Sequence, residues 1–189
     1  MSSDKQRQTP PGDLAFFAKS QLLTSEEVER ALKRMAHEIV ERNHGSPQLS
    51  VIGLQVGGVA FGVRIAQLLS EILGTEVSLG FLDVSFYRDD LHRNPIPKST
   101  ATTIDHDLTD RTVVLVDDVL FTGRTIRAAL NALSDWGRPH SVQLAVMVDR
   151  GHRELPIRTD YVGKNLPTSL DEAIRATIEG VWIGTKESS

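Results

Sequence analysis

One segment of the chain combines residue types that suit a phosphorylated sugar. The apolar run Val113-Val114-Leu115-Val116 leads into the adjacent carboxylates Asp117 and Asp118, and Val119-Leu120-Phe121-Thr122-Gly123-Arg124-Thr125 follows. The apolar run predicts a buried parallel strand, and open α/β sheets bind ligands at the carboxyl ends of such strands. The turn and the helical pattern after it offer backbone N–H groups to a phosphate, whereas the carboxylates suit sugar hydroxyls or Mg²⁺. In the alternative interpretation, Thr122 and Thr125 only cap an ordinary helix.

A second candidate loop, Gln55-Val56-Gly57-Gly58, follows the apolar run Leu49–Leu54. Because Gly57 and Gly58 lack side chains, the backbone can come close to a bulky anion there. A tight turn between a strand and a helix explains the same glycines equally well. The loop is not a Walker A motif, because no Gly-Lys-Ser or Gly-Lys-Thr follows it.

The elements that must position these loops alternate along the chain, which predicts a mostly parallel central sheet flanked by helices. Thr24-Ser25-Glu26-Glu27 predicts a capping box, and the apolar side chains after it share one helical face. We expect further helices near residues 65–73 and 126–135, further strands at 77–87, 143–148 and 161–162, and a hairpin at 176–183. Residues 88–104, with two prolines, predict a mobile loop.

Composition indicates one soluble globular domain. The chain has 189 residues, of which 40% are hydrophobic and 24% charged, with a formal net charge of −4. This balance argues against a general polyanion binder but permits a local basic face. The absence of cysteine excludes disulfides and thiolate chemistry, and no apolar run approaches the ~20 residues of a membrane span. We expect residues 1–20 to be a disordered tail without a signal peptide, residues 21–186 to form a single domain, and the protein to be cytoplasmic.

Residues 113–125 resemble the PRPP-binding signature of the type I phosphoribosyltransferases. The resemblance implies that family's α/β fold, a mostly parallel central sheet flanked by helices with a small hood. It also implies that residues 122–125 bind the 5′-phosphate, that Asp117 and Asp118 act on the ribose, and that Gly57 and Gly58 belong to a pyrophosphate loop. Mg²⁺ would bind with PRPP rather than through direct protein ligands. Many relatives carry Lys or Arg in that loop, whereas Gln55 and Val56 are uncharged, so pyrophosphate would be held more weakly here.

The expected mobile loop opens with Phe86-Tyr87-Arg88-Asp89-Asp90. A lid at this place would keep water from an oxocarbenium-like centre, and Arg88 is the candidate catalytic contact to pyrophosphate. Arg93 and Lys98 are interpreted as solvated loop charges, and His106 as a surface residue.

The cationic block Val148-Asp149-Arg150-Gly151-His152-Arg153-Glu154-Leu155-Pro156-Ile157-Arg158 extends the resemblance. With the residues that follow it, this block is similar to the family of bifunctional pyrimidine-operon regulators that are also uracil phosphoribosyltransferases. The resemblance implies a basic surface for leader mRNA, made of Lys33, Arg34, His37, Arg42, Arg150, His152, Arg158 and Lys164. A solvated helix face with internal salt bridges is the alternative for the cations of the first helix.

The implied function is uracil + PRPP → UMP + pyrophosphate, together with binding of leader mRNA controlled by UMP or UTP. The implied partners are PRPP, uracil, uridine nucleotides, leader mRNA and further copies of the chain in a homo-oligomer, with no membrane. Two alternatives stay open. One is an RNA-binding regulator with weak or lost turnover, and the other is a plain phosphoribosyltransferase for another base.

Overall fold

A computed structural model describes residues 16–46, 48–85 and 101–186. Five parallel strands form the central sheet in the order β3-β2-β4-β5-β6. Their bounds are β2 Leu49–Leu54, β3 Ser78–Leu82, β4 Thr112–Leu120, β5 Ser141–Asp149 and β6 Tyr161–Asn165. The chain builds outward from β2 to β3 and then returns to the other side of β2 with β4. The sheet therefore has its topological switch point between β2 and β4, which is where doubly wound sheets bind ligands.

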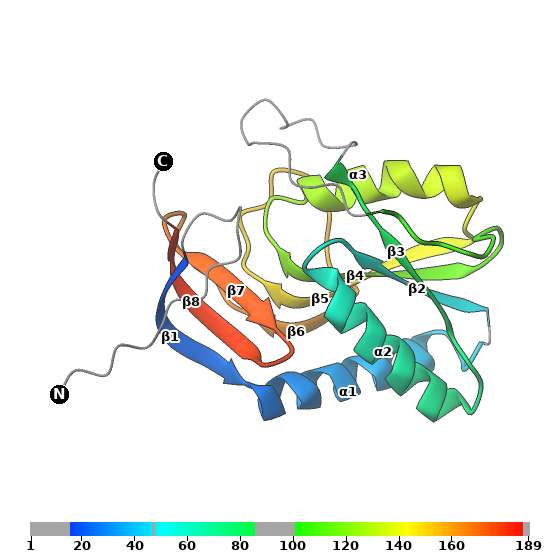
Figure 1. Ribbon diagram of the computed structural model, residues 1–189, viewed down its shortest axis with the longest axis horizontal. Helices are drawn as coiled ribbons and strands as arrows, with labels where there is room; N and C mark the ends of the chain where they lie inside the picture. Colours follow the sequence, from blue (N-terminus) through cyan, green and yellow to red (C-terminus); the bar gives the residue numbers. More distant parts are fainter. Residues whose placement is uncertain (1–15, 47, 86–100, 187–189) are drawn as a thin grey trace.

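Helices cover both faces of this sheet, as the sequence predicts (Figure 1). α1 (Ser25–Arg42) and α2 (Gly58–Leu73) pack on one face, while α3 (Arg124–Leu133) and a short 3-10 turn, Ser134–Trp136, pack on the other. β2 and β4 are fully buried along most of their length, so they read as continuous apolar runs. The predicted capping box is present: Thr24 Oγ1 accepts from the N–H of Glu27, and the Glu27 carboxylate accepts from the N–H of Thr24.

A small antiparallel sheet, the hood, lies beside the central sheet (Figure 1). It consists of β1 (Phe16–Thr24), β8 (Gly180–Lys186) and β7 (Ala173–Thr177), in that order. The hairpin predicted at 176–183 is confirmed as β7 and β8, but its turn is Ile178-Glu179 and not the expected Glu179-Gly180, because Gly180 already pairs with Thr177. The prediction of a disordered tail is wrong for residues 16–20, because they pair with β8. Most of β1 is exposed, so its sequence carries no apolar alternation that would reveal a strand.

The strand predicted at 77–87 is shorter, and residues 86–87 lie outside the described residues together with 88–100 and 1–15. Thr103 exchanges two backbone hydrogen bonds of 2.8 Å with Phe81, so the end of the predicted loop is fixed against β3. In the part of the chain that the structure describes, no helix is long and apolar enough to cross a membrane.

Candidate functional site

The two candidate loops meet at the switch point, because they follow the neighbouring strands β2 and β4. A Cβ atom added to Gly57 would lie 2.4 Å from both Cγ and Oδ2 of Asp118, and one added to Gly58 would lie 2.1 Å from the Val116 carbonyl oxygen. Real Cβ atoms do not come so close, so a side chain at Gly58 would collide with backbone, whereas one at Gly57 would have to displace the Asp118 carboxylate. The glycines do form a tight turn between β2 and α2, as the alternative interpretation expected. The same turn places the backbone of the Gln55–Gly58 loop against the Asp118 carboxylate.

The carboxylates of Asp117 and Asp118 differ in their surroundings. Asp117 is 8% exposed and its Oδ1 accepts from the backbone N–H of Asp118 at 3.0 Å. Asp118 is half-buried at the edge of the sheet, and its Oδ1 accepts from the N–H of Val119 at 2.7 Å. Asp118 therefore presents its side chain at the carboxyl edge, while Asp117 supports the backbone from the interior.

A third carboxylate at this edge, Asp83, was missed by the sequence reasoning. Asp83 follows β3, is 7% exposed, and accepts from the N–H and the hydroxyl of Ser85 at 2.8 and 2.5 Å. The Gln55 N–H donates to the Leu82 carbonyl at 2.9 Å, which brings Asp83 beside the glycine loop. The available signal was an acid directly after an apolar strand, the same pattern that identified Asp117.

The turn at the end of β4 has the geometry of an anion site. Gly123 has φ of 92°, a left-handed conformation that favours glycine, and it precedes the first residue of α3. No side chain caps this helix at Gly123, although Thr122 Oγ1 accepts a long hydrogen bond of 3.4 Å from the N–H of Arg124. The first N–H groups of a helix carry positive partial charge, so this end suits a phosphate.

The segment 150–157 holds this turn from outside. The N–H groups of Glu154 and Leu155 both donate to the Thr122 carbonyl, at 3.1 and 3.3 Å. Arg124 forms an ion pair with Glu154, with Nε to Oε2 at 2.7 Å. Arg153 Nη1 donates to the Phe121 carbonyl at 2.8 Å. Part of the cationic block thus supports the turn at residues 122–125 instead of facing solvent; we call it the phosphate turn, after the ligand that the sequence predicts for it.

Most of the residues predicted to bind RNA gather where α1 runs along the edge strand β6. Arg34 Nη2 donates to the carbonyls of Val162 and Gly163, both at 2.9 Å, and Nη1 pairs with Glu38 at 2.7 Å. Lys33 is 58% exposed beside Glu29. We define the α1–β6 basic surface by six exposed basic residues of α1, of β6 and of the segment just before β6: Lys33, Arg34, His37, Arg42, Arg158 and Lys164.

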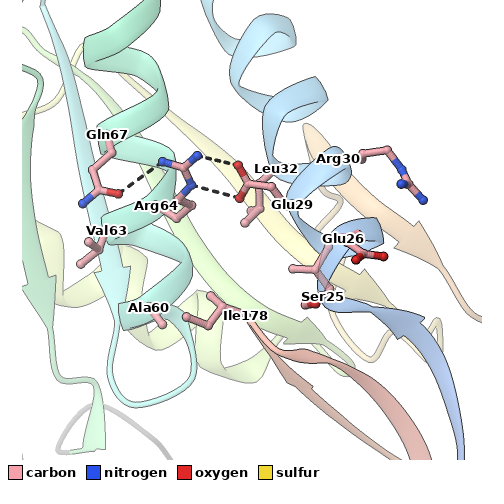
Figure 2. Close-up of a pocket in the computed structure, with 11 residues that line it drawn as sticks. Ser25, Glu26, Glu29, Arg30, Leu32, Ala60, Val63, Arg64, Gln67 and Ile178 are labelled. Atoms are coloured by element: carbon pink, nitrogen blue, oxygen red, sulfur yellow. Dashed lines mark hydrogen bonds and ion pairs between the residues drawn. The ribbon is translucent and has the colours of Figure 1, made fainter.

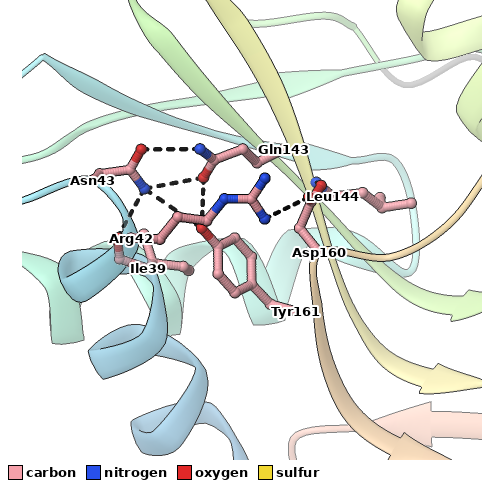
Figure 3. Close-up of polar contacts among 7 residues, drawn as sticks. All are labelled: Ile39, Arg42, Asn43, Gln143, Leu144, Asp160 and Tyr161. Atoms are coloured by element: carbon pink, nitrogen blue, oxygen red, sulfur yellow. Dashed lines mark hydrogen bonds and ion pairs between the residues drawn. The ribbon is translucent and has the colours of Figure 1, made fainter.

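Arg42 occupies the end of this surface within a polar network (Figure 3). It donates to Asp160 at 2.6 Å and lies over the Tyr161 ring, 5.7 Å from its centroid. The hydrogen bond to Asp160 raises the pKa of Arg42, and burial raises the pKa of Tyr161. The Tyr161 hydroxyl donates to Gln143 at 2.7 Å, and Gln143 exchanges hydrogen bonds with Asn43. The network joins α1 to β5 and β6.

Two predicted RNA contacts lie apart from this surface. Arg150 is only 8% exposed and its guanidinium faces Phe121, so burial removes it from the RNA surface that the sequence predicts. His152 is exposed but lies edge-on to Phe121, with ring centroids 5.7 Å apart, next to the phosphate turn.

His106, expected at the surface, has 15% of its side chain exposed, and its Nε2 lies 2.7 Å from the hydroxyl oxygen of Ser50. Arg88, Arg93 and Lys98 lie outside the described residues.

A groove of about 650 Å³ lies elsewhere, between α1, α2 and the β7–β8 turn (Figure 2). Arg64 spans one side of it and is held by Glu29 through contacts of 2.5 and 3.0 Å. None of its lining residues belongs to the 113–125 segment.

Among the described residues, no group of three or more His, Cys, Asp or Glu side chains could hold a metal ion by itself. A metal ion beside Asp118 would therefore also need oxygen atoms from a molecule bound in the site.

Comparisons with known proteins agree with this geometry. The family described as "Phosphoribosyl transferase domain" matches residues 18–177. The chain is 55% identical to Bifunctional protein PyrR of Deinococcus radiodurans, over 85% of this chain and 88% of that protein. It is 58% identical to Bifunctional protein PyrR of Herpetosiphon aurantiacus, over 82% of this chain and 86% of that protein. A hypoxanthine phosphoribosyltransferase structure from Trypanosoma cruzi has a TM-score of 0.70 at 21% identity, covering 90% of this chain and 98% of that one, and it bears on the fold alone.

Proposed function

The chain belongs to the phosphoribosyl transferase domain family and, within it, to the PyrR proteins. From this premise, we propose which residues carry out its two functions. It is a bifunctional protein that catalyses uracil + PRPP → UMP + pyrophosphate and regulates pyrimidine biosynthesis. The observation that carries the assignment of the site is the close approach of Gly57 to the Asp118 side chain, which brings the Gln55–Gly58 loop against the 113–125 segment.

The reaction forms a bond between a uracil ring nitrogen and the anomeric carbon of PRPP as pyrophosphate leaves. Positive charge develops on the ribose, so catalysis depends on positioning and on negative charge near the ring. We assign residues 122–125 to the 5′-phosphate, supported by the uncapped start of α3 and the left-handed Gly123. We assign the ribose hydroxyls and the developing charge to Asp118, with Asp117 fixing the backbone beneath it.

The pyrophosphate would lie against the backbone of Gln55–Gly58, because Gly57 has no side chain to separate that backbone from the Asp118 carboxylate. Mg²⁺, bound with PRPP, would neutralise charge on the leaving group. Asp118, the half-buried carboxylate beside this loop, would offer a hard oxygen close to such an ion, in addition to the oxygens of PRPP itself. The role of Arg88 on pyrophosphate stays a prediction.

The regulatory half is proposed to act through the α1–β6 basic surface. RNA loops are bound by cations on their phosphates and by planar guanidinium groups against exposed bases. Hydrogen bonds to Val162, Gly163 and Asp160 hold Arg34 and Arg42 in fixed positions, which lowers the entropy lost when RNA binds. The cytoplasmic location and the homo-oligomeric state expected from the sequence remain predictions.

A second candidate function is a uridine-nucleotide-dependent RNA regulator with weak turnover. The Gln55–Gly58 loop carries no cation, so it favours ligands without pyrophosphate. Formation of UMP from uracil and Mg-PRPP separates the two functions, because an efficient enzyme turns over and a pure sensor only binds UMP. Titration of leader RNA with and without UMP separates both from a plain phosphoribosyltransferase. Loss of RNA affinity with rising salt would measure the number of phosphate contacts.

A further inference from the structure

Arg150 is a buried cation that the proposed reaction does not use. It follows β5 directly, at the same carboxyl edge as the signature turn, and is 8% exposed. A buried charge is costly unless its hydrogen-bond donors are satisfied, so the partners of this guanidinium indicate why the residue is there.

Those partners come from two segments that are distant in sequence. On one side the guanidinium stacks on Phe121, with Cζ 4.0 Å from the ring centroid, and the Arg150 N–H donates to the Leu120 carbonyl at 3.1 Å. On the other side, Nε donates to Thr168 Oγ1 at 2.9 Å, and Nη2 donates to the carbonyls of Ser169 and Glu172 at 3.1 and 2.8 Å. One side chain thus joins the residue before the phosphate turn to the stretch that leads into β7.

Phe121 is fixed by further contacts of the same block. Its carbonyl accepts from Arg153, and its ring meets the edge of His152. His152 Nε2 also donates to the Thr168 carbonyl at 2.5 Å, so it repeats the link that Arg150 makes. The next residues are Thr122 and Gly123, where the phosphate is proposed to bind. Movement of the Phe121 ring would therefore be transmitted directly to the backbone N–H groups of the phosphate turn.

We propose that Arg150 is a positioning residue of the nucleotide site, which holds the phosphate turn and the stretch that leads into β7 in one arrangement through Phe121 and Thr168. The proposal rests on the assignment of UMP and PRPP to this site. Small displacements of binding groups lower catalysis strongly, because a ligand must lie within a fraction of an ångström of its productive position. Lysine cannot replace arginine here, because an ammonium group has no planar fork to stack on Phe121 while it donates toward Thr168 and Glu172.

The experiment measures UMP affinity by calorimetry and the kinetics of UMP formation for wild type, Arg150→Met, Arg150→Lys and Thr168→Val. Arg64→Met is the matched control, since Arg64 is also a partly buried, paired arginine but lies on α2 beside Glu29. We expect Arg150→Met to weaken UMP binding roughly ten- to hundredfold, as for lost hydrogen bonds to a charged group. Its KM for PRPP should rise more than its kcat falls, and Arg150→Lys should recover little. Thr168→Val should show a smaller loss, and the control should bind like wild type at a comparable thermal midpoint.

If Arg150→Met does not fold, the same measurements of UMP affinity and kinetics on Thr168→Val and Arg150→Lys test the proposal. UMP affinity within about twofold of wild type in folded Arg150 variants would refute the positioning role, whatever their loss of thermal stability. The proposed function fails separately, through absence of UMP and PRPP binding by the wild-type protein.

Discussion

The carboxylate of Asp118 occupies the space that a side chain at position 57 would need. Gly57 has φ of −66° and ψ of −37°, which any residue adopts, so the backbone conformation does not explain the glycine. The close approach of Asp118 does. This contact brings the loop after β2 and the loop after β4 into one site at the switch point.

Gly57→Ala should therefore weaken UMP binding without a backbone penalty. The new methyl group would displace the Asp118 carboxylate, and we expect a rise of roughly tenfold in the dissociation constant of UMP, measured by calorimetry. Gly74→Ala is the control, because Gly74 has φ of 67° and open space around it. That control should lose stability and keep its affinity. Equal UMP affinity of Gly57→Ala and wild type would contradict the assigned contact.

Asp118→Asn should abolish UMP formation while the fold is kept. Asparagine can still accept the hydrogen bond from Val119, so local structure survives, but it brings no negative charge to the ribose. We expect a fall in kcat of at least about a hundredfold in a steady-state assay. Asp135→Asn, an exposed acid after α3, should behave as wild type. Turnover near wild type in Asp118→Asn would remove this residue from the mechanism.

Gln55→Lys tests the uncharged pyrophosphate loop. Gln55 Nε2 donates to the Ala101 carbonyl at 3.1 Å, and a lysine ammonium in this place adds a charge-assisted contact for pyrophosphate. We expect the KM for PRPP to fall several-fold, while UMP affinity stays unchanged because UMP lacks pyrophosphate. Gln55→Met tests whether loss of the contact to Ala101 alone has an effect. An equal gain in affinity for both ligands would argue against a pyrophosphate role.

Arg158→Ala should weaken binding of leader RNA and leave UMP formation little changed. Arg158 is exposed and lies in the segment just before β6, and no role in the proposed reaction is assigned to it. Loss of one phosphate contact should reduce the slope of log affinity against log salt by about one. Arg138→Ala removes the same charge from an exposed position before β5 and should change neither measurement. Unchanged RNA affinity of Arg158→Ala would remove the main support for this surface.

The Glu29–Arg64 pair predicts a pH-dependent part of stability. The hydrogen bond from Arg64 lowers the pKa of Glu29 below 4.5, so the stabilisation is present above pH 4.5 and is lost as pH falls through the folded-state pKa. Glu29 is 35% exposed, which limits the contribution to about 1 kcal/mol or less. Glu29→Gln should therefore be less stable than wild type in urea at pH 7, and the difference should shrink as pH falls below 4.5 and Glu29 becomes protonated. Glu71→Gln, which lies 3.6 Å from the same arginine, should show a smaller difference.

Local sequence patterns were sufficient for several elements. The capping box at Thr24 and Glu27 formed as expected, because both partners lie within one helical turn. The apolar run before Asp117 forms a buried strand. It could be predicted because a strand covered on both faces has a continuous apolar sequence instead of an alternating one. β1 was not predicted, since its pairing with β8 depends on backbone hydrogen bonds to the other end of the chain and its side chains are mostly exposed.

The residue types of the 113–125 segment determined by themselves which ligand chemistry the chain offers, because carboxylates, glycine and hydroxyls near a helix start have fixed binding preferences. Tertiary structure alone decided which cations lie at the surface. Arg34 and Arg42 stay exposed beside β6, whereas Arg150 is buried against Phe121 because β5 ends next to β4. A sequence shows that a residue is charged, but burial depends on which distant segments pack around it.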